Sequence, residues 1–179
     1  MDKKIAFIGT GNMGGAIIHS VCRAIPAKEV VITDIDHKKA ADMAADLGCV
    51  QVDDNAAAVK AAHYIVLGVK PQVMPAVLKE IAPVLQDCKE NGKQRILISI
   101  AAGLTMEKIK DILGEAGTDL PIIRILPNTP AMIGEGLMII IAGSDVSQDE
   151  VDGLRECISA CGKVVQIQDE KMADAAMVM

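Results

Sequence analysis

The chain has 179 residues, a net charge of −6 at pH 7 and a hydrophobic fraction of 51%, which indicates one α/β domain with a sizeable core and at most a small appendage. The negative charge, and an aromatic content limited to Phe7 and Tyr64, argue against a nucleic-acid partner or an anionic membrane surface. Five cysteines without a Cys-x-x-Cys pair indicate reduced thiols and a cytoplasmic location, and no apolar stretch is long enough to cross a membrane.

The first predicted elements are a strand over 5–8, a glycine-rich turn and a helix over 13–23. The turn reads Gly9-Thr10-Gly11-Asn12-Met13-Gly14. In this pattern the glycines permit a tight turn, the close approach of a pyrophosphate and the packing of the helix on the strand, while the helix N-terminus attracts an anion. The stretch therefore predicts a dinucleotide site; the alternative is a tight strand-to-helix turn without a ligand.

A second strand and helix follow, and an acidic residue separates them. Residues 30–33 predict a strand, and Asp34 comes about 20 residues after the last glycine, where a carboxylate binds the hydroxyls of the adenosine ribose. Such a carboxylate repels the 2′-phosphate of NADPH. Lys38 and Lys39 lie in the helix predicted over 36–47. The charge pattern favours a solvated helix face for both lysines, and the alternative is that they reach a 2′-phosphate and offset the repulsion. The expected cofactor is NAD(P)H, with a leaning to NADH.

Strands and helices continue to alternate, which predicts a doubly wound, mostly parallel, Rossmann-like sheet. Further strands are predicted over 49–52, 64–67, 96–100, 122–126, 137–141 and 163–167. Further helices are predicted over 55–62, 72–85, 105–113, 147–160 and 169–179, with a solvated connection over 87–94. The candidate N-caps are Asp34 or Asp36, Asp53 or Asp54, Thr105 and Ser147.

The loops of unusual composition all follow predicted strands: 9–14, 34, 68–71, 101–103 and 127–130. Because the carboxyl ends of parallel strands meet at one edge of a sheet, these loops predict a single site. No nucleophile is paired with a base, no metal site is predicted, and His19, His37 and His63 have no recognisable partner. We therefore expect the chemistry to be that of the cofactor, a hydride transfer from a nicotinamide.

Four motifs, in this order and spacing, strongly resemble pyrroline-5-carboxylate reductase: Gly9–Gly14, Gly68–Gln72, Ser99–Gly103 and Arg124–Pro130. The resemblance covers residues 3 to about 177 and implies reduction of the C=N bond of 1-pyrroline-5-carboxylate to L-proline, the last step of proline biosynthesis. Members of the family continue into a helical C-terminal domain that forms the dimer and completes the substrate site.

That comparison implies a dinucleotide-binding domain over 1–167 and, over 168–179, the start of a linker or helix toward a C-terminal domain that is missing here. It implies a homo-oligomer for the full-length protein. The chain alone is then expected to be truncated and weakly active or inactive.

The resemblance also assigns individual residues. The residues implied to bind the cofactor are Gly9, Gly11, Asn12, Met13, Gly14, Asp34, Asn55, Val69, Lys70, Pro71, Ala101, Ala102 and Gly103. Asn128 and Thr129 are implied to lie beside the reacting ring as catalytic-site residues, the alternative being that they only close a turn between two prolines. For Lys70, a contact with the pyrophosphate or with the substrate carboxylate is a hypothesis.

Two other functions remain open at this stage. One is a dinucleotide-binding module without catalysis. The other is a different imine reductase, or an oxidoreductase of the F420-dependent NADP reductase type, on the same scaffold. Substrate-dependent oxidation of the cofactor distinguishes the binding module from an enzyme. A panel of substrates distinguishes the other reductases from a pyrroline-5-carboxylate reductase.

Overall fold

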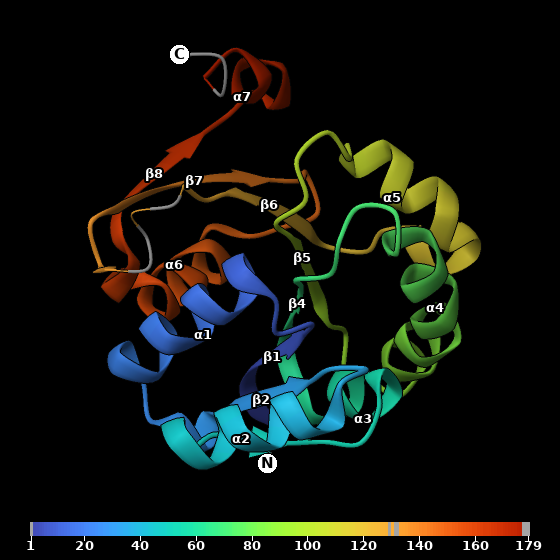
Figure 1. Cartoon of the computed structure of the whole chain (residues 1–179). Helices are drawn as coiled ribbons and strands as arrows, with labels where there is room; N and C mark the ends of the chain where they lie inside the picture. The colour runs from blue at the N-terminus through green and yellow to red at the C-terminus, as the bar shows by residue number, and fades with distance from the viewer. Residues whose placement is uncertain (1, 129, 131–132, 177–179) are drawn as a thin grey trace.

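The computed structural model describes residues 2–128, 130 and 133–176, and these form an α/β fold around one sheet (Figure 1). The strands are β1 (Lys3–Ile8), β2 (Val30–Thr33), β3 (Val50–Gln51), β4 (Ala62–Leu67), β5 (Ile96–Ser99), β6 (Ile122–Leu126), β7 (Gly136–Ala142) and β8 (Gly162–Ile167). The α-helices are α1 (Asn12–Ala24), α2 (His37–Leu47), α3 (Asn55–Ala61), α4 (Met74–Glu90), α5 (Met106–Leu113), α6 (Gln148–Cys157) and α7 (Glu170–Ala176). Short 3₁₀ turns are η1 (Ala27–Glu29), η2 (Gly114–Gly117) and η4 (Ser159–Cys161).

The eight strands lie in the order β3-β2-β1-β4-β5-β6-β7-β8. All neighbouring pairs are parallel except β6 and β7, which are antiparallel. The reversal follows from the length of the connection, because the chain between Leu126 and Gly136 is shorter than the dozen or so residues that a parallel crossover needs. The predicted doubly wound, mostly parallel sheet is confirmed.

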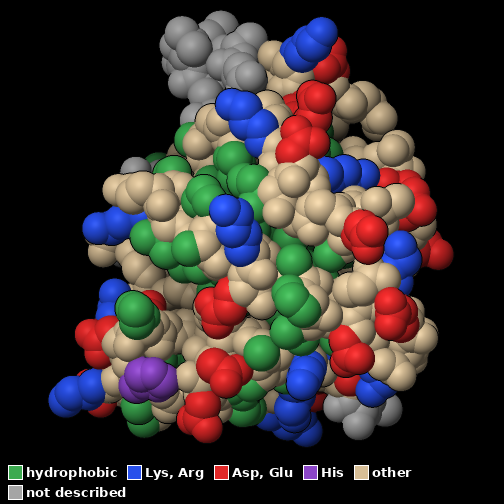
Figure 2. Space-filling model, turned by 90° about the vertical axis from the view of Figure 1, so that its right-hand side faces the viewer, with side chains coloured by type: hydrophobic (Ala, Val, Ile, Leu, Met, Phe, Trp, Pro, Cys, Tyr) green, Lys and Arg blue, Asp and Glu red, His purple; other side chains and the backbone are tan. Residues whose placement is uncertain are grey.

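Both faces of the sheet are buried, as continuous apolar strands predict. Along β1, Ile5 and Phe7 pack toward α1, α2 and α6, whereas Ala6 and Ile8 pack toward α3, α4 and α5. The two helical layers lie on opposite sides of the sheet in Figure 1. On the face toward α4 and α5, hydrophobic side chains lie among acidic and basic ones (Figure 2). The part of the chain described here contains no helix with the length and apolar character needed to span a bilayer.

Local sequence signals set the starts of the helices. Side-chain oxygens of Asp36, Asp54, Thr105 and Ser147 accept hydrogen bonds from backbone amides in the first turns of α2, α3, α5 and α6. These four positions were among the predicted caps. Gly48 ends α2 in the left-handed conformation, with a φ of 78°.

Two predicted boundaries were wrong. Residues 87–90 belong to the last turn of α4 rather than to a solvated connection, because the charged side chains there are accommodated on an exposed helix face. The helix that begins after Ser147 ends at Cys157, and Cys161 lies in a separate 3₁₀ turn. Consequently Cys157 and Cys161 do not share a helix.

Candidate dinucleotide site

The glycine-rich turn after β1 is packed directly against the end of β4. The amide of Gly9 donates to the carbonyl of Thr33 at 2.9 Å, and the amide of Gly68 donates to the carbonyl of Ile8 at 2.8 Å. Gly9 has a φ of +100°, and a Cβ at this position would lie 2.8 Å from the carbonyl carbon and oxygen of Gly68. Only glycine fits such an approach of two backbones.

The start of α1 is arranged to receive an anion. Gly11 is the N-cap of α1 and has no side chain, so no side-chain oxygen accepts from the first amides of this helix. A Cβ built on Gly11 meets no atom within 4 Å, which leaves open space above the turn. Asn12 is exposed beside this space, whereas Met13 packs against the core and holds the helix in place. Free amides and the helix dipole together favour a pyrophosphate here.

Asp34, at the carboxyl end of β2, holds the glycine-rich turn. Its Oδ2 accepts from the amide and from the hydroxyl of Thr10, both at 2.7 Å, and its Oδ1 accepts from the amide of Asp36 at 2.9 Å. Burial raises the pKa of this carboxyl, but the hydrogen bonds from Thr10 and Asp36 outweigh burial, so its pKa is below the ordinary value. The carboxylate stays ionised at neutral pH, and its oxygens keep acceptor capacity for a ribose hydroxyl.

A cavity of about 490 Å³ opens beside Asp34 and is bounded by the ends of β1, β2 and β4 and by α3 and α4. It contains four of the residues assigned to the cofactor: Gly9, Asp34, Asn55 and Val69. The Nδ2 of Asn55 donates to Glu80 at 3.0 Å, which fixes the amide at the wall. The other residues that line the cavity are Ile8, Thr33, Ile35, His37, Asp53, Asp54, Val73, Ala76, Val77 and Glu80. The lining thus carries four carboxylates and no lysine or arginine.

A second cavity, of about 380 Å³, lies on the other side of the glycine-rich turn, between α1 and α2. It includes Gly11 and Asn12 together with the basic side chains of His19, Arg23 and Lys39. Arg23 and Lys39 are therefore next to the turn but not in the lining of the acidic cavity, which contains one histidine, His37.

The remaining assigned residues lie on loops at the same edge of the sheet. The carbonyl of Lys70 accepts from the amides of Val73 and Met74, so Lys70 and Pro71 belong to the turn that leads into α4. Ala101 is buried, and its amide donates to the hydroxyl of Ser99 at 3.2 Å. Ala102 and Gly103 are exposed beside it.

Asn128, on the loop after β6, uses its side chain to hold that loop. Its Oδ1 accepts from the amide of Leu137 at 2.9 Å, which ties the loop to the start of β7. This contact fits the alternative interpretation of Asn128 as a residue that closes the turn. Thr129 lies outside the described residues.

Sequence reasoning missed two contacts of buried arginines inside the domain. Arg124 on β6 is 1% exposed and its Nη1 donates to Glu170 of α7 at 2.7 Å. Arg95, just before β5, is 2% exposed and bonds Asp2 at 2.6 Å. The only available signal for Arg124 was a charge inside an apolar strand.

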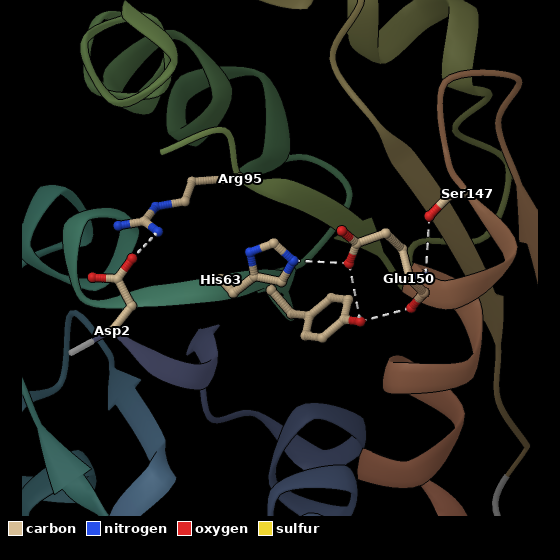
Figure 3. Close-up of polar contacts among 6 residues, drawn as sticks. Asp2, His63, Arg95, Ser147 and Glu150 are labelled. Carbon is tan, nitrogen blue, oxygen red and sulfur yellow. Dashed lines mark hydrogen bonds and ion pairs between the residues drawn. The ribbon is translucent and has the colours of Figure 1, made fainter. Parts of the chain in front are cut away.

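The prediction that His63 has no partner was wrong. His63 lies on β4 rather than beside a helix, and its Nε2 is 2.8 Å from Oε2 of Glu150 on α6 (Figure 3). The hydroxyl of the adjacent Tyr64 donates to the backbone carbonyl of Glu150 at 2.6 Å. These contacts, like Arg95 with Asp2, lie at the amino end of the sheet and away from the glycine-rich turn.

The family model described as "NADP oxidoreductase coenzyme F420-dependent" matches residues 4–103, the segment that contains β1 to β5 and the glycine-rich turn. The chain belongs to this family. In open α/β sheets ligands bind outside the carboxyl ends of the strands, and the matched segment includes the glycine-rich turn at that edge.

Individual relatives of the chain carry a more specific name. A pyrroline-5-carboxylate reductase of Pseudomonas aeruginosa is 33% identical over 173 residues, which are 96% of this chain and 60% of that protein. One from Haemophilus influenzae is 32% identical and covers 97% of this chain and 60% of its own length. The chain therefore spans about 60% of the length of these curated relatives.

Solved structures give the same picture. A pyrroline-5-carboxylate reductase from Coxiella burnetii superposes with a TM-score of 0.88 at 25% identity, covering 100% of this chain and 64% of that one. The Plasmodium falciparum pyrroline carboxylate reductase, solved with NADP bound, has a TM-score of 0.81 at 25% identity over 98% of this chain and 62% of its own. The resemblance predicted from the four motifs is confirmed.

Proposed function

We propose that this chain is the dinucleotide-binding part of a pyrroline-5-carboxylate reductase, which reduces the C=N bond of 1-pyrroline-5-carboxylate to L-proline. The observation that carries the proposal is the 33% identity to the Pseudomonas aeruginosa enzyme over 96% of the chain. The placement of every predicted loop in the described chain at one edge of the sheet supports it. Under this proposal, residues 1–167 form the dinucleotide domain and 168–179 begin the link to a further domain.

The chain's own residues suit the two halves of a dinucleotide. The pyrophosphate is assigned to Gly11 and the first amides of α1, because this turn has open space and unsatisfied N–H groups. The adenosine is assigned to the cavity of about 490 Å³, where Ile35 is 96% exposed and provides an apolar rim. When bound, the reduced nicotinamide supplies the hydride for the imine carbon.

We further propose that the preferred cofactor is NADH. Asp34 stands where the ribose hydroxyls bind, and three further carboxylates line the same cavity without a lysine or arginine to balance them. A 2′-phosphate placed there meets like charges, which disfavours NADPH. The basic side chains that line the second cavity, His19, Arg23 and Lys39, attract a phosphate and therefore act against the preference for NADH.

The reacting end of the site is assigned to Ala101, Ala102 and Gly103 and to Asn128 and Thr129, since their loops follow β5 and β6, next to β4 in the sheet. These loops border the nicotinamide and exclude water from it, and Lys70 stays a candidate contact for a phosphate or carboxylate. Most groups that bind the substrate are expected in the part of the relatives that this chain does not span. Assembly as a homo-oligomer and a cytoplasmic location, which the free cysteines fit, are proposed with this function.

The test is substrate-dependent loss of the near-ultraviolet absorbance of the reduced nicotinamide, with NADH and NADPH run in parallel. It is carried out on this chain and on a version with the remaining part of the Pseudomonas aeruginosa relative appended. Turnover with 1-pyrroline-5-carboxylate, faster in the extended version and faster with NADH, is the expected result. Tight cofactor binding without turnover in either version would overturn the assignment and favour a module that binds dinucleotide without catalysis.

A further inference from the structure

A single carboxylate on α7 connects two of the loops that border the proposed site. Oε1 of Glu170 accepts from the backbone amide of Met106 at 3.1 Å and from Nη1 of Arg124 at 2.7 Å. Met106 begins α5, directly after the loop that contains Ala101–Gly103. Arg124 lies on β6, four residues before Asn128. The same oxygen atom therefore joins the elements that position both loops.

The strand register places Arg124 next to the first loop as well. Arg124 is the partner of Ser99 in the parallel pairing of β5 and β6, and the Ser99 hydroxyl accepts from the amide of Ala101. One turn after Glu170, Ala173 packs with Leu126 and Ile141 in a small apolar cluster, so α7 rests on the carboxyl end of β6. Any shift of α7 is transmitted to both loops through these contacts.

The energetics of Arg124 argue against a purely structural role. Its Nε and Nη2 are buried, and neither has a hydrogen-bond partner among the described residues. Leaving such groups unsatisfied destabilises a fold, and apolar residues of similar shape often replace a buried ion pair without loss of stability. Arg95 offers the contrast, because its guanidinium donates to Asp2 (Figure 3) and also to the carbonyls of Val59 and Lys60. Stability alone therefore does not account for an arginine at position 124.

From this geometry we infer that Arg124 and Glu170 are positioning residues: they set the loops at Ala101–Gly103 and Asn128 relative to each other at the reacting end of the site. The inference rests on the proposed function for its kinetic consequence. The two hydrogen bonds that Glu170 accepts are observed contacts, and their effect on the loops is tested separately from the kinetics. Neither residue touches the cofactor in this scheme; both act through the loops they hold.

The variants are Glu170→Ala, Glu170→Gln, and the pair Arg124→Met with Glu170→Leu, which replaces the ion pair by apolar groups of similar size. The matched control is Arg95→Met, which breaks the other buried arginine pair at the amino end of the sheet. Hydrogen exchange of the Met106 amide is measured first. We expect Glu170→Ala to speed it by about tenfold or more, Glu170→Gln to change it less because a carbonyl acceptor remains, and Arg95→Met to leave it unchanged.

Steady-state kinetics are measured next on the same variants, made in the extended version of the chain. We expect the kcat for the imine substrate to fall by about tenfold in Glu170→Ala and in the paired variant, with the KM for NADH within about twofold, and Glu170→Gln to recover part of the loss. The emission of bound NADH, which reports the surroundings of the nicotinamide, should change in the same variants and not in Arg95→Met.

Two results overturn the inference: an unchanged Met106 exchange rate in Glu170→Ala, or an equal loss of kcat in Arg95→Met at equal stability. If the unsubstituted protein shows no turnover even in the extended version, the proposed function fails instead. Exchange at Met106 and the emission of bound NADH then decide the positioning role by themselves.

Discussion

Replacing Asp34 by Asn tests both the architecture of the glycine-rich turn and the cofactor preference. The carboxylate accepts two hydrogen bonds from Thr10 at 2.7 Å and one from the amide of Asp36 at 2.9 Å. An asparagine side chain has one acceptor oxygen. It can accept either from Thr10 or from the amide of Asp36, and its NH₂ group then faces the other donor. At least one hydrogen bond to a charged group is lost, which is worth about 1.5–3 kcal/mol.

We therefore expect Asp34→Asn to lower the free energy of unfolding by about 2 kcal/mol and the Tm by about 4–8 °C, measured by urea and thermal unfolding. Titration with the reduced cofactors should show the affinity for NADPH rising about tenfold relative to NADH, because the carboxylate no longer repels the 2′-phosphate. The matched control is Asp42→Asn, which removes the same charge from an exposed ion pair with Lys38. It is expected to change neither quantity.

The pH dependence gives an independent check on this carboxylate. Its pKa in the folded protein lies below the ordinary value of 3.8, so its contribution to stability is present above that pH and is lost as the pH falls through the folded pKa. The stability difference between the unsubstituted protein and Asp34→Asn should therefore be constant at neutral pH and shrink in acid. An equal stability of the two at neutral pH, or an unchanged ratio of NADPH to NADH affinity, would refute the reasoning.

Three further substitutions probe the other contacts. Gly9→Ala should destabilise the protein by about 1–3 kcal/mol in urea unfolding and abolish dinucleotide binding, since its Cβ would meet Gly68; full binding would contradict the packing of the turn. Tyr64→Phe should lower the free energy of unfolding by about 1–2 kcal/mol, because it removes the hydrogen bond from the phenol hydroxyl to the part-buried carbonyl of Glu150; an unchanged midpoint in urea would exclude that contact as a source of stability. Asp54→Ala should lower the free energy of unfolding by about 0.5–2 kcal/mol through loss of the N-cap of α3, with an unchanged m-value; a changed m-value would point to a wider rearrangement.

Much of this fold was predictable because its signals are local. A strand, a glycine turn and a helix within Ile5–Ala24 specify one another by near-neighbour contacts, and the caps at Asp54 and Thr105 bond amides three residues away. Alternation of apolar strands with amphipathic helices then limits the sheet to a doubly wound form. The edge that carries the site follows from that topology.

The parts that escaped prediction depend on partners far apart in the chain. Arg124 and Glu170 are 46 positions apart, Arg95 and Asp2 are 93, and His63 and Glu150 are 87. No local pattern identifies the two members of such a pair. A charge inside an apolar strand, as at Arg124, indicates a buried group, but it does not show which distant residue is its partner. The position of Asp34 was predicted, but its bonds to Thr10 were not, since they appear only when β1 and β2 lie side by side.

The contact between β4 and α6 has an optical consequence. Tyr64 is the single tyrosine of a chain that contains no tryptophan, so the near-ultraviolet absorption of the protein comes from one phenol ring. That ring is 3% exposed, and its hydroxyl is bonded to the backbone of α6. Burial and the neighbouring carboxylate of Glu150 raise its pKa well above the ordinary value, so the ring stays un-ionised in moderately alkaline solution. Loosening of α6 from the sheet can therefore be followed, without any label, as the alkaline titration of a single chromophore.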